Sequence, residues 1–272
     1  MVDKAIATGR FKDRVIIITG AAGSFGSNCA NRFASEGAKV VITDIVEEAK
    51  LQEQAKTIEK QFNTKAVAVR CDVTNYTQVE QVVKTAHEAF GRIDYLFNNA
   101  GYQGLFIKAF DYPVDDFEKV LKINTQGIFY FLKAVSTYMV KQGHGAIVNT
   151  ASQAGVDGAP NMVAYATSKA AVIGMTKTSS RDLAPYNIRV NAISPAFIDS
   201  GYMWFRQCEL QAQANSIYYD KDPKVVSQQM LNSVPMRRAG TVDEVIGTVA
   251  FLLSDDAGYI TGMNIQITGG IL

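Results

Sequence analysis

Seven short apolar runs, most of them rich in β-branched residues, constrain the fold more than any other feature of the sequence. Several are apolar throughout rather than alternating, which is typical of strands buried on both faces of a parallel sheet. The segments between them have a helical period, as at 46–62 and 76–91. This alternation predicts an α/β fold, a doubly wound parallel sheet of seven strands with helices on both faces. The predicted strands are 15–19, 39–43, 66–70, 94–98, 146–150, 188–194 and 263–268.

One region, at about 195–234, interrupts this rhythm. It is rich in aromatic residues, Met and Gln, and it follows the end of a predicted strand. Open α/β sheets bind ligands at strand ends, so we expect a helical substrate lid here. The alternative is an amphipathic helical hairpin that packs against a partner subunit. No linker rich in Pro, Gly or Ser divides the chain, so we predict a single domain over residues 1–272.

Charge and cysteine content narrow the functional classes. The formal net charge of +1 gives no general attraction to nucleic acid or to an anionic membrane. No apolar run is long enough for a signal peptide core or a membrane span, so we expect a cytoplasmic protein. Cys29, Cys71 and Cys208 are widely spaced and odd in number, and the two histidines are isolated. We therefore predict a reducing compartment and no metal site.

The loop TGAAGSFG at 19–26 follows the first predicted strand and precedes a helical stretch. Unpaired N–H groups at a helix start attract phosphate, and Gly20 and Gly26 permit a tight turn and close packing. Asp44 ends the second predicted strand, where an acid can accept both ribose hydroxyls of an adenosine and repel a 2′-phosphate. No Lys or Arg adjoins it in TDIVEE, so NAD is favoured over NADP. Asp72, after the third strand, either meets the adenine or caps the next helix.

A candidate catalytic group lies between residues 150 and 169. Tyr165 and Lys169 are four residues apart, so they share one face of a helix. A phenol is a poor base at neutral pH, and lowering its pKa by roughly 3 units takes about 4 kcal/mol. A neighbouring ammonium and a nicotinamide cation could supply this stabilisation. Ser152 follows a predicted strand and could hydrogen-bond a substrate oxygen, whereas Asn98 and Asn99 are expected mainly to brace their turn.

Over residues 11–270 the chain resembles the short-chain dehydrogenases/reductases, because it carries the motifs of that family in the same order. These motifs are the glycine loop, Asp44, Asp72-Val73, NNAG at 98–101, Asn124, Ser152, Tyr165 with Lys169 and the Pro195 turn. The resemblance implies a Rossmann fold and a homotetramer. It implies that Tyr165 is the general base or acid, that Lys169 lowers its pKa, that Ser152 orients the substrate oxygen and that Asn124 holds a relay water. The cofactor contacts it implies are Gly20, Ser24, Phe25, Gly26, Asp44, Ile45, Asp72, Val73, Asn99, Ala100, Gly101, Tyr165, Lys169, Pro195, Ile198 and Ser200.

Two positions depart from the pattern of that family: Ser24 stands where the loop commonly has Gly, and Ala196 follows Pro195 in place of Gly. We expect Ser24 to preserve pyrophosphate binding, and Ala196 leaves the geometry at the base of the lid open.

Several segments resemble in sequence the NAD-dependent polyol dehydrogenases of that family, among them FNNAGYQG, MWFRQCELQA and DPKVVSQQM. This implies interconversion of a secondary alcohol and its ketone, with xylitol and D-xylulose as the favoured pair. A polyol needs hydrogen-bond partners and apolar walls, and the candidates are Gln103, Ser152, Gln153, Asn161, Met162 and Trp204. The alternatives are a dehydrogenase or reductase of a bulkier substrate, of steroid or 3-oxoacyl type, or a non-catalytic NAD-binding scaffold.

Overall fold

The computed structural model describes residues 9–271, and its centre is one parallel sheet. The strands lie in the order β3-β2-β1-β4-β5-β6-β9, and every neighbouring pair is parallel. The predicted doubly wound, seven-stranded α/β fold is therefore confirmed; residues 1–8 and 272, assigned to the same domain by the sequence, lie outside the described residues. The strands are β1 (Val15–Thr19), β2 (Lys39–Asp44), β3 (Ala66–Arg70), β4 (Tyr95–Asn98), β5 (Gly145–Thr150), β6 (Ile188–Pro195) and β9 (Asn264–Ile267).

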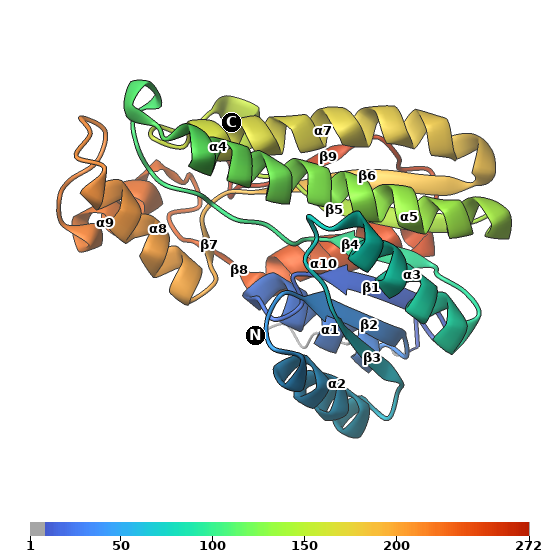
Figure 1. Ribbon diagram of the computed structural model, residues 1–272. Coiled ribbons are helices and arrows are strands. Elements are labelled where there is room, and N and C mark those ends of the chain that lie inside the picture. The colour runs from blue at the N-terminus through green and yellow to red at the C-terminus, as the bar shows by residue number, and fades with distance from the viewer. Residues whose placement is uncertain (1–8, 272) are drawn as a thin grey trace.

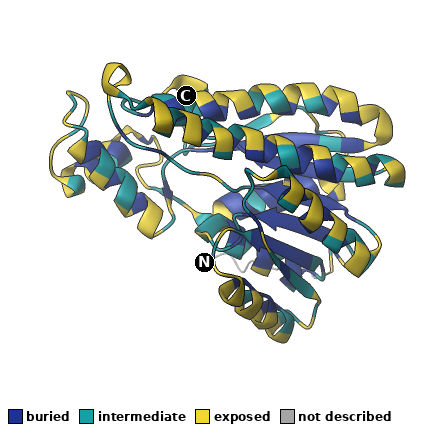
Figure 2. Ribbon diagram, viewed as in Figure 1, coloured by how far each residue is buried: buried dark blue, intermediate teal, exposed yellow. Residues whose placement is uncertain are grey.

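Helices cover both faces of this sheet (Figure 1). One apolar core joins the sheet to α1 (Ser24–Ser35), α2 (Glu48–Phe62) and α10 (Val242–Leu253). The other joins it to α3 (Tyr76–Phe90) and α5 (Gly127–Gln142), and α7 (Val163–Leu183) packs on that side against β6. Short helices α4 (Val114–Leu121) and α6 (Ala154–Asp157) complete the framework. The inner strands are buried and the edge strands β3 and β9 are partly exposed, while the outer helix faces are exposed, as Figure 2 shows. The continuous apolar runs of the inner strands thus lie where their pattern predicts.

Local signals explain where these elements begin and end. Asn75 caps α3, its side chain accepting a hydrogen bond from the backbone of Gln78, and Gly91 ends the helix with a φ of 72°. Both match the sequence expectation for 76–91. The helix expected from residue 46 begins instead at Glu48, because Glu47 takes an extended conformation before it. A π-helical turn at Lys122–Gln126 joins α4 to α5 and was not predicted.

The region at 195–234 forms β7 (Ile198–Asp199), α8 (Tyr202–Gln213) and α9 (Pro223–Ser233) beside the carboxyl ends of the strands (Figure 1). β7 pairs with β8 (Gly240–Thr241) outside the main sheet. The two helices pack on each other through a small apolar cluster centred on Trp204, Cys208 and Met230. This cluster is separate from the two cores of the sheet.

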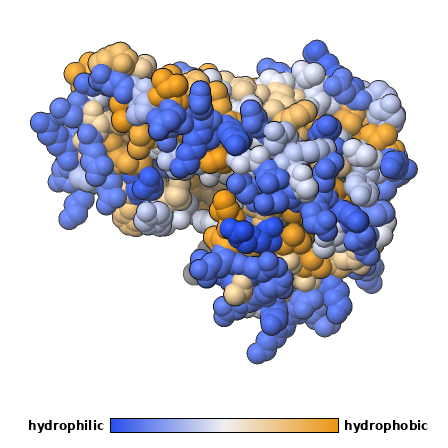
Figure 3. All heavy atoms as spheres, viewed as in Figure 1, coloured by the Kyte–Doolittle hydropathy of each residue, from blue (hydrophilic) through white to orange (hydrophobic). Residues whose placement is uncertain are grey.

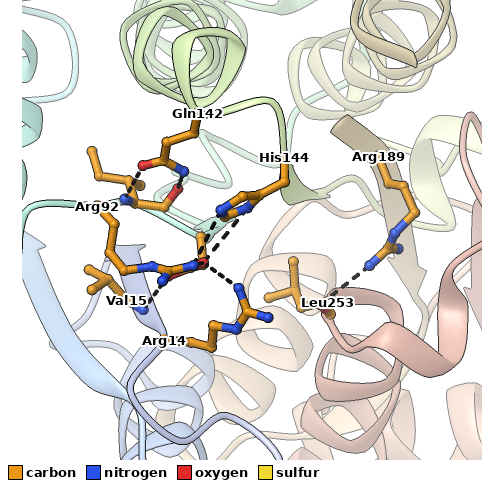
Figure 4. Close-up of polar contacts among 9 residues, drawn as sticks. Arg14, Val15, Arg92, Gln142, His144, Arg189 and Leu253 are labelled. Atoms are coloured by element: carbon orange, nitrogen blue, oxygen red, sulfur yellow. Dashed lines mark hydrogen bonds and ion pairs between the residues drawn. The ribbon is translucent and has the colours of Figure 1, made fainter. Parts of the chain in front are cut away.

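At the opposite end of the sheet a buried carboxylate ties several elements together. Asp94 is 1 % exposed and accepts hydrogen bonds from the Val15 backbone at 2.8 Å and from Arg14 at 3.0 Å. Arg92 also pairs with it, and the His144 ring lies 3.7 Å away. Figure 4 shows Arg14, Arg92 and His144 converging from three segments. This cluster fixes the amino-terminal ends of β1, β4 and β5, far from the end at which the sheet can bind ligands.

None of the described helices is long and apolar enough to cross a membrane.

Candidate active site

A cavity of about 690 Å³ lies at the carboxyl ends of the strands and extends under the lid. Its lining brings together the glycine loop, the ends of β2 to β6, the start of α7 and the inner side of α8. Figure 3 shows the surface hollowed between the lid and the body of the molecule, with hydrophilic and hydrophobic residues mixed over the lid. The strand order reverses between β1 and β4, which is where open α/β sheets bind their ligands.

The glycine loop makes its turn because two of its residues have no side chain. Gly20 has a φ of +65°, and a Cβ there would lie 2.9 Å from the Cα of Ala100. A Cβ at Gly26 would lie 2.2 Å from the Gly20 carbonyl oxygen, so α1 packs directly on the loop. No side chain among the described residues caps α1, and its first turn holds no acid. The loop and the helix start therefore fit a phosphate, which would meet unpaired N–H groups and a positive dipole end.

The Asp44 carboxylate is fixed by the backbone around it. Its Oδ2 accepts a hydrogen bond from Ala22 N at 2.9 Å and its Oδ1 accepts one from Ile45 N at 2.7 Å. Asp44 lines the cavity, as an acid that binds a ribose must, and Ile45 lines it as well. A cation that the sequence reasoning missed lies nearby: Arg70, the register partner of Asp44, donates from Nε to the Ile45 carbonyl at 3.2 Å.

Asp72 lines the cavity beyond Asp44, and the structure rules out one of its two expected roles. The cap of α3 is Asn75, not Asp72. Asp72 Oδ1 instead accepts hydrogen bonds from Thr74 N at 2.9 Å and Thr74 Oγ1 at 2.8 Å, which shapes the turn before the helix. Val73 lies beside it in the lining, so this turn forms the wall of the predicted adenine pocket.

Ser152, Tyr165 and Lys169 converge at the inner end of the cavity. Lys169 is 2 % exposed, its Nζ donates to the Thr150 carbonyl at 2.7 Å, and it lies 5.6 Å from the centre of the Tyr165 ring. Ser152 forms a hydrogen bond with the Tyr165 phenol. A hydroxyl and a phenol thus lie together at this end of the cavity, with an ammonium close to the phenol ring, and the first two can hydrogen-bond a substrate oxygen.

Burial dominates the protonation of this group. Desolvation lowers the pKa of Lys169 to about 8. Desolvation also raises the pKa of Tyr165, and the hydrogen bond with Ser152 only partly opposes it. The expectation that Lys169, together with the charge of a nicotinamide ring, lowers the tyrosine pKa stays a prediction.

The asparagines near the catalytic group have structural roles. Asn98 Nδ2 donates to the Ile128 carbonyl at 2.8 Å, and Asn99 Nδ2 donates to the Thr19 carbonyl at 3.1 Å, which confirms that both brace the strand ends. Asn124 is buried in the π-helical turn, and its side chain bonds both backbone groups of Tyr102 and the Ser168 hydroxyl. Asn124 is absent from the described cavity lining, and these contacts occupy its side chain.

The expected substrate residues divide into two groups. Gln103, Gln153, Met162 and Trp204 line the cavity, whereas Asn161 is not among the described lining residues. The Asn161 amide donates instead to Gln211 Oε1 at 2.8 Å.

Gln207 and Gln211 of α8 also line the cavity and were not predicted, although their spacing of four residues places them on one helix face. Asp157, Met203 and Tyr219 were missed as well.

Comparison with known proteins agrees with this geometry. The family described as Enoyl-(Acyl carrier protein) reductase matches residues 20–272. Levodione reductase of Leifsonia aquatica is 36% identical over 97% of this chain and 96% of its own length. A crystal structure described as NAD+-bound xylitol dehydrogenase superposes with a TM-score of 0.93 at 51% identity, covering 96% of this chain and 99% of that one. The chain belongs to the short-chain dehydrogenase/reductase family.

Other members of the family act on different substrates by name. The NAD-dependent glycerol dehydrogenase of Listeria innocua is 36% identical over 95% of this chain and 93% of its own length. The 3-oxoacyl-[acyl-carrier-protein] reductase FabG of Thermotoga maritima is also 36% identical, over 97% and 99%. The chain is therefore an oxidoreductase of this family, and its own substrate has to be argued from its site.

Of the remaining cofactor residues that the family resemblance implies, all but one line the cavity. These are Ser24, Phe25, Asn99, Ala100, Gly101, Pro195, Ile198 and Ser200. Gly26 is absent from the described lining, since it serves the packing of α1 on the loop. At Gly101 a Cβ would lie 3.4 Å from Asn124 Oδ1 and 3.6 Å from Lys169 Nζ. The backbone of Gly101 therefore lies close to both Asn124 and Lys169.

Proposed function

We propose that this protein is an NAD-dependent polyol dehydrogenase that interconverts xylitol and D-xylulose or a closely related pair. The observation that carries the proposal is the convergence of Ser152, Tyr165 and Lys169 on one cavity whose other half holds Asp44. The 51% identity to a structure described as NAD+-bound xylitol dehydrogenase, over 96% of this chain, supports the choice of substrate and cofactor.

In this proposal the glycine loop and the start of α1 bind the pyrophosphate, Asp44 the adenosine ribose, and the turn at Asp72 the adenine. Ile198 and Ser200 lie at the nicotinamide end, and Lys169 binds the second ribose. NAD+ supplies the hydride acceptor when bound. The lining of the cavity supports these assignments, as does the start of α1, where the described residues provide no side-chain cap and no acid.

The protein residues handle the proton. Ser152 holds the substrate hydroxyl, and Tyr165 as phenolate takes its proton as the C–H hydrogen leaves as hydride. Because burial raises the pKa of Tyr165, the phenolate needs positive charge close to it. The protonated form of Lys169 supplies part of this charge, and an oxidised cofactor would add the rest. Lys169 then gives one of its protons to a water near Asn124 and takes up the proton released from Tyr165.

A second candidate is oxidation or reduction of a bulkier substrate. The relatives named levodione reductase and 3-oxoacyl-[acyl-carrier-protein] reductase favour it, as do the apolar side chains of Met162, Met203 and Trp204 in the cavity lining. A non-catalytic NAD-binding scaffold is the least favoured reading, because the whole catalytic group is present.

The proposal includes a single domain over 1–272 with residues 195–234 as the substrate lid, a homotetramer and a cytoplasmic location. Exposed apolar side chains such as Phe129, Phe251 and Tyr259 support self-association. The buried, unpaired cysteines support a reducing compartment.

The test is a panel of polyols, hydroxysteroids and acyl-thioester ketones assayed with NAD and NADP by NADH or NADPH absorbance. We expect polyols with NAD to give the highest kcat/KM. Tyr165→Phe should lower kcat by roughly a thousandfold or more while leaving NAD binding within about threefold of wild type. Turnover of steroids alone, or a preference for NADP, would contradict the proposal.

A further inference from the structure

Two amide side chains in the substrate half of the cavity each have a carbonyl oxygen without a partner. Gln103 Oε1 and Gln153 Oε1 are buried, and neither accepts a hydrogen bond from any described residue. Both residues line the cavity, and Gln153 is only 7 % exposed. An unsatisfied buried acceptor costs about 1–3 kcal/mol, so two of them beside one cavity indicate a ligand that brings donors.

The orientation of the Gln153 amide is set by Asp157. Gln153 Nε2 donates to Asp157 Oδ2 at 2.5 Å, the two residues lying four apart around α6. A carboxylate only accepts hydrogen bonds, so the amide cannot exchange its nitrogen and oxygen without losing this contact. The Gln153 oxygen is thereby fixed as the free end, able to accept and unable to donate.

Gln103 lies against α8. Its Nε2 donates to Gln207 Oε1 at 3.4 Å, and its own Oε1 has no partner among the described residues. One turn further along α8, Gln211 accepts from Asn161 at 2.8 Å and donates to the Pro160 carbonyl at 3.1 Å. Gln211 is 2 % exposed, so it anchors α8 and holds Gln207 over Gln103.

We propose that Gln103 and Gln153 bind two hydroxyl groups of the substrate other than the one that reacts, and that Gln207 and Asp157 are their positioning residues. This inference rests on the proposed function and deepens it. Each unpaired amide oxygen can accept a hydrogen bond from one substrate hydroxyl, whereas a ketone, an ether or an acyl chain has no donor to offer. The site therefore selects alcohols with at least three hydroxyls, and the apolar side chains around it shape the pocket rather than define the substrate.

The experiment compares the full-length enzyme with pairs of variants, using KM and kcat for xylitol and for butane-2,3-diol at saturating NAD. Asp157→Leu and Gln207→Leu remove the acceptor that orients each amide; Asp157→Asn and Gln207→Glu retain an acceptor oxygen. Gln213→Leu is the matched control, because Gln213 is exposed on the same helix as Gln207.

We expect KM for xylitol to rise about ten- to hundredfold in Asp157→Leu and about tenfold in Gln207→Leu, with kcat changed less than about threefold. Asp157→Asn, Gln207→Glu and Gln213→Leu should stay within about threefold of wild type. KM for butane-2,3-diol should stay within about threefold of wild type in at least one of the two leucine variants, because its one further hydroxyl can use only one of the two amides.

An equal rise of KM for xylitol and for the diol in both leucine variants would show a merely structural role and would overturn the inference. An unchanged KM for xylitol in both leucine variants would overturn it too. Trp204, the one tryptophan of the chain, lines the cavity, so its fluorescence reports xylitol binding without turnover. If no polyol yields NADH, the proposed function fails. Binding that still weakens in the leucine variants would then uphold the amide assignment, and binding that does not weaken would refute it.

Discussion

The sharpest prediction concerns Asp44 and the choice between NAD and NADP. In Asp44→Ala the adenosine ribose loses a charged acceptor, and such hydrogen bonds contribute about 1.5–3 kcal/mol. NAD binding should therefore weaken about ten- to hundredfold. At the same time the repulsion of a 2′-phosphate disappears. Unit charges 4 Å apart repel by about 4 kcal/mol at an effective dielectric constant of 20, and the half-buried position of Asp44 reduces this to about 2 kcal/mol.

The two effects act in opposite directions on the two cofactors, so the NAD preference should narrow by roughly several hundred- to a few thousandfold. The measurement is kcat/KM for NAD and for NADP with one polyol. Asp44→Asn separates charge from geometry, because the amide oxygen can still accept from Ala22 N. Asp44→Asn should recover part of the kcat/KM for NAD that Asp44→Ala loses, while keeping the increase in kcat/KM for NADP. Glu48→Gln removes a nearby exposed carboxylate and should leave the ratio unchanged.

Arg70 extends this prediction. Its Nε donates to the carbonyl of Ile45, the residue that follows Asp44, so its positive charge lies close to the proposed ribose site. The double variant Asp44→Ala with Arg70→Ala should therefore bind NADP less well than Asp44→Ala alone. A preference that moves less than about threefold in Asp44→Ala would refute the reasoning, and cofactor choice would then rest on other residues.

Two further predictions concern stability. The pKa of Lys169 is lowered to about 8 in the folded protein, so the unfolded state binds more protons between pH 8 and the ordinary lysine value. The free energy of unfolding should therefore rise with pH in that window. Measured by urea unfolding, the free energy of wild type should increase by about 2 kcal/mol relative to that of Lys169→Met between pH 7 and 9.5. If the two proteins show the same dependence on pH, the burial argument is contradicted. Asp94→Asn removes the buried acceptor of Arg14 and Arg92 and should lower the free energy of unfolding by about 1–3 kcal/mol, because both arginines remain partly exposed to water. NAD binding should not change, since the cluster lies at the far end of the sheet, and a loss below about 1 kcal/mol would show that the pairs contribute little.

Much of the sheet could be predicted from the sequence because its strands are buried on both faces. The runs at 15–19 and 66–70 match β1 and β3 residue for residue, and Gly91 ends α3 where expected. A parallel strand in a doubly wound fold leaves an apolar signature that needs no knowledge of its neighbours. The ends of such strands face the ligand, which is why residues after them lie in the cavity.

Contacts between elements could not be predicted in the same way. Arg70 reaches the Asp44 region only because β2 and β3 pair in a particular register, and nothing in TDIVEE signals it. Asn161 was expected at the substrate, yet the position of α8 turns its amide to Gln211. The raised pKa of Tyr165 likewise depends on burial rather than on the spacing to Lys169.

The small apolar cluster of the lid has a consequence for how this enzyme can diversify. Trp204, Cys208 and Met230 pack among themselves rather than into the cores of the sheet. Such a unit can open locally at a free energy below that of global unfolding. Substitutions inside it are then nearly independent of the sheet in their effect on stability. Selection can therefore rewrite the lid for new substrates while the catalytic half stays unchanged.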